Sequence, residues 1–232
     1  MEPARSYTVE IEEEATWPLS PAESFRRAKT QFFLDRAEDF IRMARYYSAR
    51  KELEKVRSLD PDNVSCLSFE KTIEENLARI QSRSHGEIGR NGNDAALGNG
   101  KRTELVLIVD QDERLLVSLA ESLHHYGFLM IGAASLEEAL ETMGYVTPDV
   151  VLSEVNFESG PRGFDLYLWM KTNNGCHDIP FLFLAARLDR DMLIAGKRFG
   201  VDDFILKPVD EEVVSASIVN CLSRRRLVPA KG

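Results

Sequence analysis

Five short apolar runs alternate with amphipathic segments over residues 104–226, and this alternation constrains the fold more than any other feature. The runs span residues 105–110, 128–133, 149–154, 179–185 and 203–207. The first run, LVLIVD, is apolar up to its last residue, as expected of a strand that is buried on both faces. Between the first two runs, Leu116, Leu119 and Leu123 follow helical spacing. Strands that alternate with helices predict right-handed βαβ units and a doubly wound α/β fold with a five-stranded parallel sheet.

The carboxyl ends of the predicted strands carry the candidate site residues. In an open α/β sheet the functional crevice lies outside these ends. They are occupied by Asp110, Glu154, Ala185 and Lys207. We therefore expect the functional crevice to lie at these residues.

A second, all-α module precedes the sheet. Residues 21–83 contain no Gly and one internal Pro, and they resemble one tetratricopeptide repeat. The positions that carry the resemblance are Phe33, Ala37, Phe40, Tyr46, Ala49, Leu53, Val56 and Pro61. Ala44 stands where the turn of such a repeat usually has Gly. A generic helical hairpin or coiled-coil segment accounts for the same pattern.

Composition divides the rest of the chain. Residues 1–20 are acidic and predicted to be flexible, residues 84–103 contain five Gly and three Asn and predict a linker, and residues 227–232 form a tail. The segment of alternating strands and helices then spans residues 104–226. Because one repeat cannot bury its apolar face alone, its aromatic side chains should pack on a second copy, on the sheet domain or on a partner. We predict a homodimer formed through residues 21–82.

Charge and composition exclude several function classes. The net charge of −9 makes nucleic acid or an anionic membrane an unexpected partner. No apolar run approaches the ~20 residues that span a bilayer. Three Cys without paired spacing fit a reducing cytoplasm and provide no metal framework. The chain has no phosphate-binding loop and no nucleophile elbow, and we expect it not to be an enzyme.

Four stretches, LIVD, PDVVLSE, IPFLFLAAR and GVDDFILKPV, occur in an order and spacing that resemble the receiver domain of response regulators in two-component and phosphorelay signalling. The resemblance covers residues 104–226 and implies a flavodoxin-like fold. It implies two acidic residues that bind Mg²⁺ after the first strand and an Asp after the third that accepts a phosphoryl group from a histidine kinase. It further implies a Thr or Ser and a Lys that contact the phosphoryl oxygens, and an aromatic residue that moves with the Thr or Ser.

The acidic pocket departs from this pattern. Asp110 is kept at the first acidic position, but Gln111 stands at the second, and Asp112 follows one residue later. Mg²⁺ prefers near-octahedral oxygen ligands and gains most from carboxylates. A neutral amide at Gln111 therefore predicts weak Mg²⁺ binding at Asp110, for which Asp112 could partly compensate, or no cofactor at all.

The acceptor and sensing positions also depart. Glu154 replaces the acceptor Asp and Ala185 replaces the Thr, whereas Lys207 is kept and Phe204 occupies the aromatic position. Glu is longer than Asp by one methylene, about 1.5 Å, and displacement of a reacting atom on this scale can cost about 100-fold in rate. Ala185 has no hydroxyl to sense a phosphoryl group. Glu154 can instead reach Lys207 and form an ion pair.

These changes favour a pseudo-receiver that is held in one state and acts through contacts with protein partners of a histidine-kinase pathway. Two other interpretations remain open. Glu154 and Lys207 could form only a structural ion pair, or the domain could be a working phosphorelay receiver with atypical site chemistry.

Overall fold

The computed structural model describes residues 20–83 and 102–227 of the chain. The predicted acidic N-terminal segment, the Gly- and Asn-rich linker and the C-terminal tail lie almost entirely outside these residues. No helix of the described residues is long and apolar enough to cross a membrane.

The sheet confirms the predicted α/β fold. Its strands are β1 (Leu105–Val109), β2 (Leu129–Ala133), β3 (Val150–Glu154), β4 (Phe181–Ala185) and β5 (Asp203–Leu206). They are parallel and lie in the order β2-β1-β3-β4-β5. Every residue of β1, β3 and β4 is buried, which explains why these strands are continuous apolar runs.

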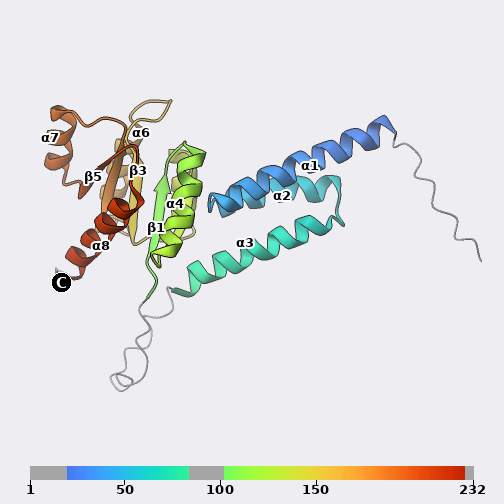
Figure 1. The fold of residues 1–232 in the computed structure, drawn as a ribbon, viewed down its shortest axis with the longest axis horizontal. Helices are drawn as coiled ribbons and strands as arrows, with labels where there is room; N and C mark the ends of the chain where they lie inside the picture. Colours follow the sequence, from blue (N-terminus) through green and yellow to red (C-terminus); the bar gives the residue numbers. More distant parts are fainter. Residues whose placement is uncertain (1–19, 84–101, 228–232) are drawn as a thin grey trace, which may run out of the picture.

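Helices cover both faces of the sheet (Figure 1). They are α4 (Glu113–His125), α5 (Leu136–Met143), α6 (Arg162–Thr172), α7 (Arg190–Phe199) and α8 (Glu211–Leu227). Helices α4 and α8 pack against each other on one face, and α5 and α6 pack against each other on the other. The hydroxyl of Tyr167 in α6 donates to the carbonyl of Phe199, a bond of 2.5 Å that ties the end of α7 to α6.

The N-terminal module consists of three helices, α1 (Pro21–Arg42), α2 (Tyr46–Leu59) and α3 (Val64–Ser82). Ser20 and Glu23 form a reciprocal capping box at the start of α1. Ala44 lies in the turn between α1 and α2 with a φ of 55°, a left-handed conformation that favours Gly. The position at which the repeat usually has Gly therefore does require this backbone conformation.

The module lies against the sheet domain on the side of α4 (Figure 1), where it contacts the edge strand β2. The amide of Gly132 in β2 donates to the carbonyl of Ala44 at 3.2 Å, so the module uses a backbone group that an edge strand otherwise leaves open. A Cβ atom at Gly132 would lie 2.4 Å from the carbonyl oxygen of Met43. Only Gly permits the two backbones to approach this closely.

Glu138, at the start of α5, accepts several of the hydrogen bonds that join the module to the sheet domain. Its carboxylate accepts from Arg45 Nε at 2.9 Å, Arg45 Nη2 at 2.7 Å and Ser48 Oγ at 2.5 Å, all from the module. It also accepts from the amide of Ala134 at 2.8 Å. The guanidinium of Arg45 lies over the Phe40 ring at 4.3 Å, which keeps the cation within the module's aromatic core.

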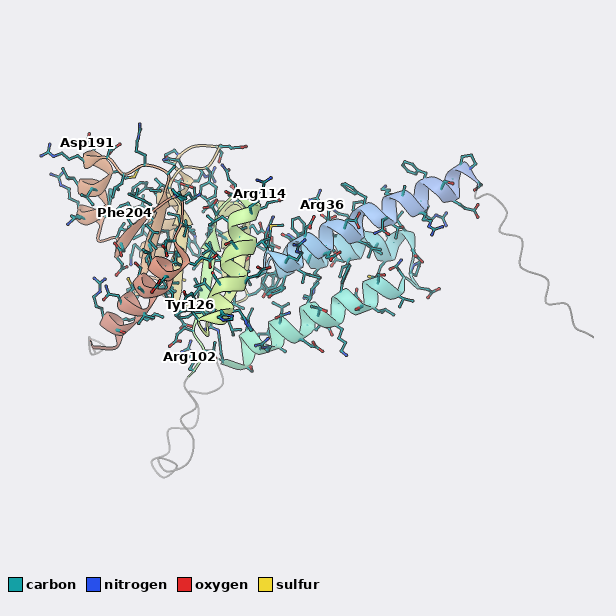
Figure 2. The ribbon with its side chains drawn as sticks, in the orientation of Figure 1. Arg36, Arg102, Arg114, Tyr126, Asp191 and Phe204 are labelled. Atoms are coloured by element: carbon teal, nitrogen blue, oxygen red, sulfur yellow. The ribbon has the colours of Figure 1, made fainter. Side chains whose placement is uncertain are left out.

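Asp149, which directly precedes β3, forms a second polar contact between the module and the sheet domain. It forms ion pairs with Arg83, which follows α3, and with Arg102, which precedes β1. Figure 2 shows Arg102 at the base of β1, near the end of α3. The ring of Tyr47 from the module also stacks on that of Tyr145 from the sheet domain, with ring centroids 4.6 Å apart. The aromatic side chains of the module were expected to pack on a second copy, on the sheet domain or on a partner. One of them, Tyr47, packs on the sheet domain.

Candidate functional site

Lys207 lies between two buried carboxylates at the carboxyl edge of the sheet. Asp110 follows β1, Glu154 ends β3 and Lys207 follows β5, so three separate strands deliver these side chains. Lys207 Nζ lies 2.6 Å from Asp110 Oδ2 and forms a second ion pair with Glu154 Oε2. Asp110 is 0% and Glu154 is 7% exposed. The predicted ion pair of Glu154 and Lys207 is therefore present, and Asp110 shares it.

The remaining carboxylate oxygens are satisfied by backbone amides of the loops that follow the strands. Asp110 Oδ1 accepts from the amide of Asp112 at 2.9 Å. Glu154 Oε1 accepts from the amides of Val155 at 2.8 Å and Asn156 at 3.1 Å. The extra methylene of Glu154 allows its side chain to fold back onto its own loop while its second oxygen reaches Lys207.

Burial and pairing shift the pKa values of this cluster. Burial raises the pKa of Asp110 above its ordinary value, although the hydrogen bonds from Lys207 and Asp112 oppose this shift. Burial acts to lower the pKa of Lys207, but its hydrogen bonds to Asp110 and Glu154 outweigh burial and the pKa is raised. Lys207 is therefore a protonated ammonium group at neutral pH.

The residues around Asp110 do not fit a Mg²⁺ ion. The inward carboxylate oxygen of Asp110 is paired with Lys207. Gln111 Oε1 accepts from the amide of Glu158 at 3.1 Å. Asp112 caps α4 by accepting from the amides of Arg114 and Leu115, so it does not replace the missing acidic residue. Within residues 20–83 and 102–227, no cluster of three His, Cys, Asp or Glu side chains could hold a metal ion.

The two remaining candidate residues are Ala185 and Phe204, which occupy the sensing positions. Ala185 is buried and contributes a carbonyl group, which accepts from the amide of Lys207 at 2.9 Å. Phe204 in β5 is half-buried and stacks on Phe183 at 5.5 Å, with its position shown in Figure 2. A Cβ atom at Gly196 in α7 would lie 2.3 Å from the Phe204 ring. The ring is therefore packed between β4 and α7.

The structure brings the predicted site residues Asp110, Glu154 and Lys207 into one cluster, whereas Gln111 and Asp112 face the neighbouring loop and helix. Sequence reasoning missed the pairing of Lys207 with Asp110. The signal was present, because a Lys at the end of one parallel strand lies at the same edge as a carboxylate at the end of another.

Comparisons with known proteins agree with the topology. The family model described as the response regulator receiver domain matches residues 106–219. The chain is 31% identical over 119 residues to an uncharacterized transcriptional regulatory protein, YvcP, from Bacillus subtilis, a match that covers 51% of this chain and 48% of that protein. It is 25% identical over 119 residues to the sensory transduction protein BceR from Halalkalibacterium halodurans, covering 51% and 50% of the two chains.

Similar chains also occur among solved structures. A response regulator from Desulfuromonas acetoxidans is 26% identical, with a TM-score of 0.48, and the match covers 52% of this chain and 98% of that one. The chain spans about half the length of the curated relatives it matches.

Proposed function

Residues 106–219 of this chain form a response regulator receiver domain of two-component signalling, and from this premise we propose that the domain is a pseudo-receiver. It would act without phosphorylation, through contacts with protein partners of a two-component pathway in the cytoplasm. The observation that carries the proposal is the closed cluster of Asp110, Glu154 and Lys207.

The cluster supports this proposal because each group that a phosphoryl transfer would need is already engaged. Lys207, which the family uses to contact a phosphoryl oxygen, is paired with two carboxylates. The second oxygen of Glu154, at the acceptor position, accepts two backbone amides. In the unmodified protein, the Glu154 carboxylate thus places a negative charge beside Lys207, where the resemblance implies a phosphoryl oxygen.

The lack of a hydroxyl at Ala185 supports the same proposal. A ligand or modification shifts a conformational equilibrium only by the difference in its interaction with the two states. Ala185 offers no side-chain hydrogen bond through which a phosphoryl group could be sensed. Phe204 packs against Phe183 without such a contact, and we propose that this position is fixed.

Incubation of the wild-type chain with acetyl phosphate and Mg²⁺ is expected to leave its intact mass unchanged. The triple variant Gln111→Asp/Glu154→Asp/Ala185→Thr is expected to gain one phosphoryl group, because it restores the acidic pair, the shorter acceptor and the hydroxyl. The same variant with Glu154→Asn lacks the acceptor carboxylate and serves as its control. Intact-mass spectrometry measures all three.

A stoichiometric phosphoryl adduct on the wild-type chain would contradict the pseudo-receiver. It would instead support the second candidate function, a working phosphorelay receiver with atypical chemistry. The observation that favours this candidate is the retention of Asp110 and Lys207 at the carboxyl edge of the sheet.

We also propose that the helical module forms a homodimer. Docking on the sheet domain leaves Phe25 and Phe32 of α1 exposed by 70% and 54%, and Leu67 of α3 exposed by 57%. Phe25 and Phe32 are seven residues apart and so lie on one face of α1, and large apolar side chains exposed in this way support a protein contact. The module would then link two receiver domains.

The mass in solution at micromolar concentration is expected to be that of a dimer. Phe25→Ser/Phe32→Ser is expected to shift the chain to a monomer, since the exposed aromatic rings would no longer be buried between copies. The control Phe199→Ser changes an exposed Phe in α7 instead. Light scattering measures the mass, and a monomeric wild-type chain would contradict this interface.

A further inference from the structure

A cleft of about 350 Å³ separates part of the helical module from the sheet domain. Helices α1 and α3 and the α1–α2 turn form one wall, and α4 and β2 form the other. The volume lies within the range of small-molecule sites, which occur preferentially at interfaces between structural units. The cleft is separate from the cluster at Lys207, with which it shares no lining residue.

Buried apolar side chains from both units form the back of the cleft, whereas its exposed lining is as polar as it is apolar. Its buried lining residues include Tyr46 and Ile80 from the module and Phe128 and Met130 from the sheet domain. Half-buried Ala120 of α4 contributes a small side chain to the wall. A flat apolar group could therefore contact both units at once.

The rim of the cleft is mainly cationic. Arg42 of α1 and Arg79 of α3 lie on it, with Glu121 of α4 as the one carboxylate of the lining that the described residues provide. Within the part of the chain that the structure describes, Arg42 pairs with Asp39 alone, at 4.0 Å between side chains that are each more than 60% exposed. Such an exposed pair contributes little and leaves the guanidinium available.

Arg79 is the stronger candidate for an anion contact. No carboxylate is paired with its guanidinium in residues 20–83 and 102–227. It lies close enough to Tyr46 to oppose, by its charge, the rise that burial causes in the pKa of the Tyr46 hydroxyl. Arg79 is exposed and lies near the buried Tyr46. Its planar guanidinium can therefore bind the carboxylate or sulfonate of a ligand whose apolar part enters the cleft.

We infer that this cleft binds a small amphipathic anion, with a flat apolar body inside and a carboxylate or sulfonate group at Arg79 and Arg42. Because both walls contact the ligand, it binds only when the module is docked. Binding therefore stabilises the docked arrangement by mass action. The cleft would make the contact between the module and the receiver domain responsive to a small molecule.

Fluorescence titration of the full-length chain with anilinonaphthalene sulfonate, an aromatic sulfonate, tests this inference. The wild type is expected to bind one equivalent with saturation. Arg79→Glu is expected to weaken binding by at least about tenfold, which corresponds to a loss of about 1.4 kcal/mol. Ala120→Trp is expected to abolish binding by filling the cleft.

The control Arg27→Glu makes the same charge change on an exposed position of α1 and is expected to bind like the wild type. Unchanged thermal unfolding of Arg79→Glu, an exposed position, shows that any loss of affinity is not a loss of fold. Equal affinity in the wild type and Arg79→Glu, or no saturable binding by the wild type, would overturn the inference.

Discussion

Lys207→Met is expected to lower the free energy of unfolding at pH 7 by about 3 kcal/mol, toward the lower end of the range of about 3–5 kcal/mol for removing one partner of a buried ion pair. The loss arises because Asp110 and Glu154 would be left buried without their common cation. The lower end applies because the Lys207 side chain is 21% exposed and water can reach it. Urea denaturation followed by circular dichroism measures the difference.

The deficit of Lys207→Met is expected to shrink as the pH falls. In the wild type the pKa of Asp110 is already raised by burial, and removal of Lys207 eliminates an effect that lowers it. A carboxyl group whose pKa is higher in the folded state stabilises the fold most below its unfolded pKa, and this contribution is lost as the pH rises through the folded pKa. The difference between variant and wild type should therefore be largest near neutrality and smaller near pH 4, around the model-peptide range.

The control for this prediction is Lys197→Met, which removes an exposed ammonium group from α7. It is expected to change the free energy of unfolding by no more than about 0.5 kcal/mol. A similarly small, pH-independent effect for Lys207→Met would show that the cluster contributes little to stability.

The sheet could be predicted because local sequence determines it. The fully buried strands β1, β3 and β4 require continuous apolar runs, and the strand ends define the edge at which Asp110, Glu154 and Lys207 meet. The pairing within that edge could not be predicted with the same certainty. It depends on how far each side chain reaches, and Glu154 divides its two oxygens between its own loop and Lys207.

Docking of the module could not be predicted from local patterns, because its contacts join distant parts of the chain. Arg45 and Glu138 are 93 residues apart and each resembles an ordinary exposed helix residue in the sequence. Gly132 within a strand was the available signal, since an isolated Gly in a strand often marks a close backbone approach. Asp149 was part of a family motif, and nothing in its neighbours indicates that it binds Arg83.

Asp149→Ala is expected to cost about 3–5 kcal/mol at pH 7 and to release the helical module. The Arg83 side chain is only 4% exposed, and burial lowers its pKa, so its cation depends on the partner carboxylate. The same substitution removes the acceptors of Arg102 at 2.8 Å and of the Leu105 amide at 2.8 Å. One side chain thus supports the end of α3, the approach to β1 and the first residue of β1.

Hydrogen exchange of amides in α1, α2 and α3 measures release of the module, and urea denaturation measures stability. Asp165→Ala removes a carboxylate that is 60% exposed and pairs with Arg162 within one helix, and it should leave both measurements nearly unchanged. Arg83→Met added to Asp149→Ala is expected to recover part of the loss, because no unpaired buried cation then remains. Strictly additive effects of the two substitutions would contradict a direct Arg83–Asp149 coupling, since residues that share an ion pair are expected to be non-additive.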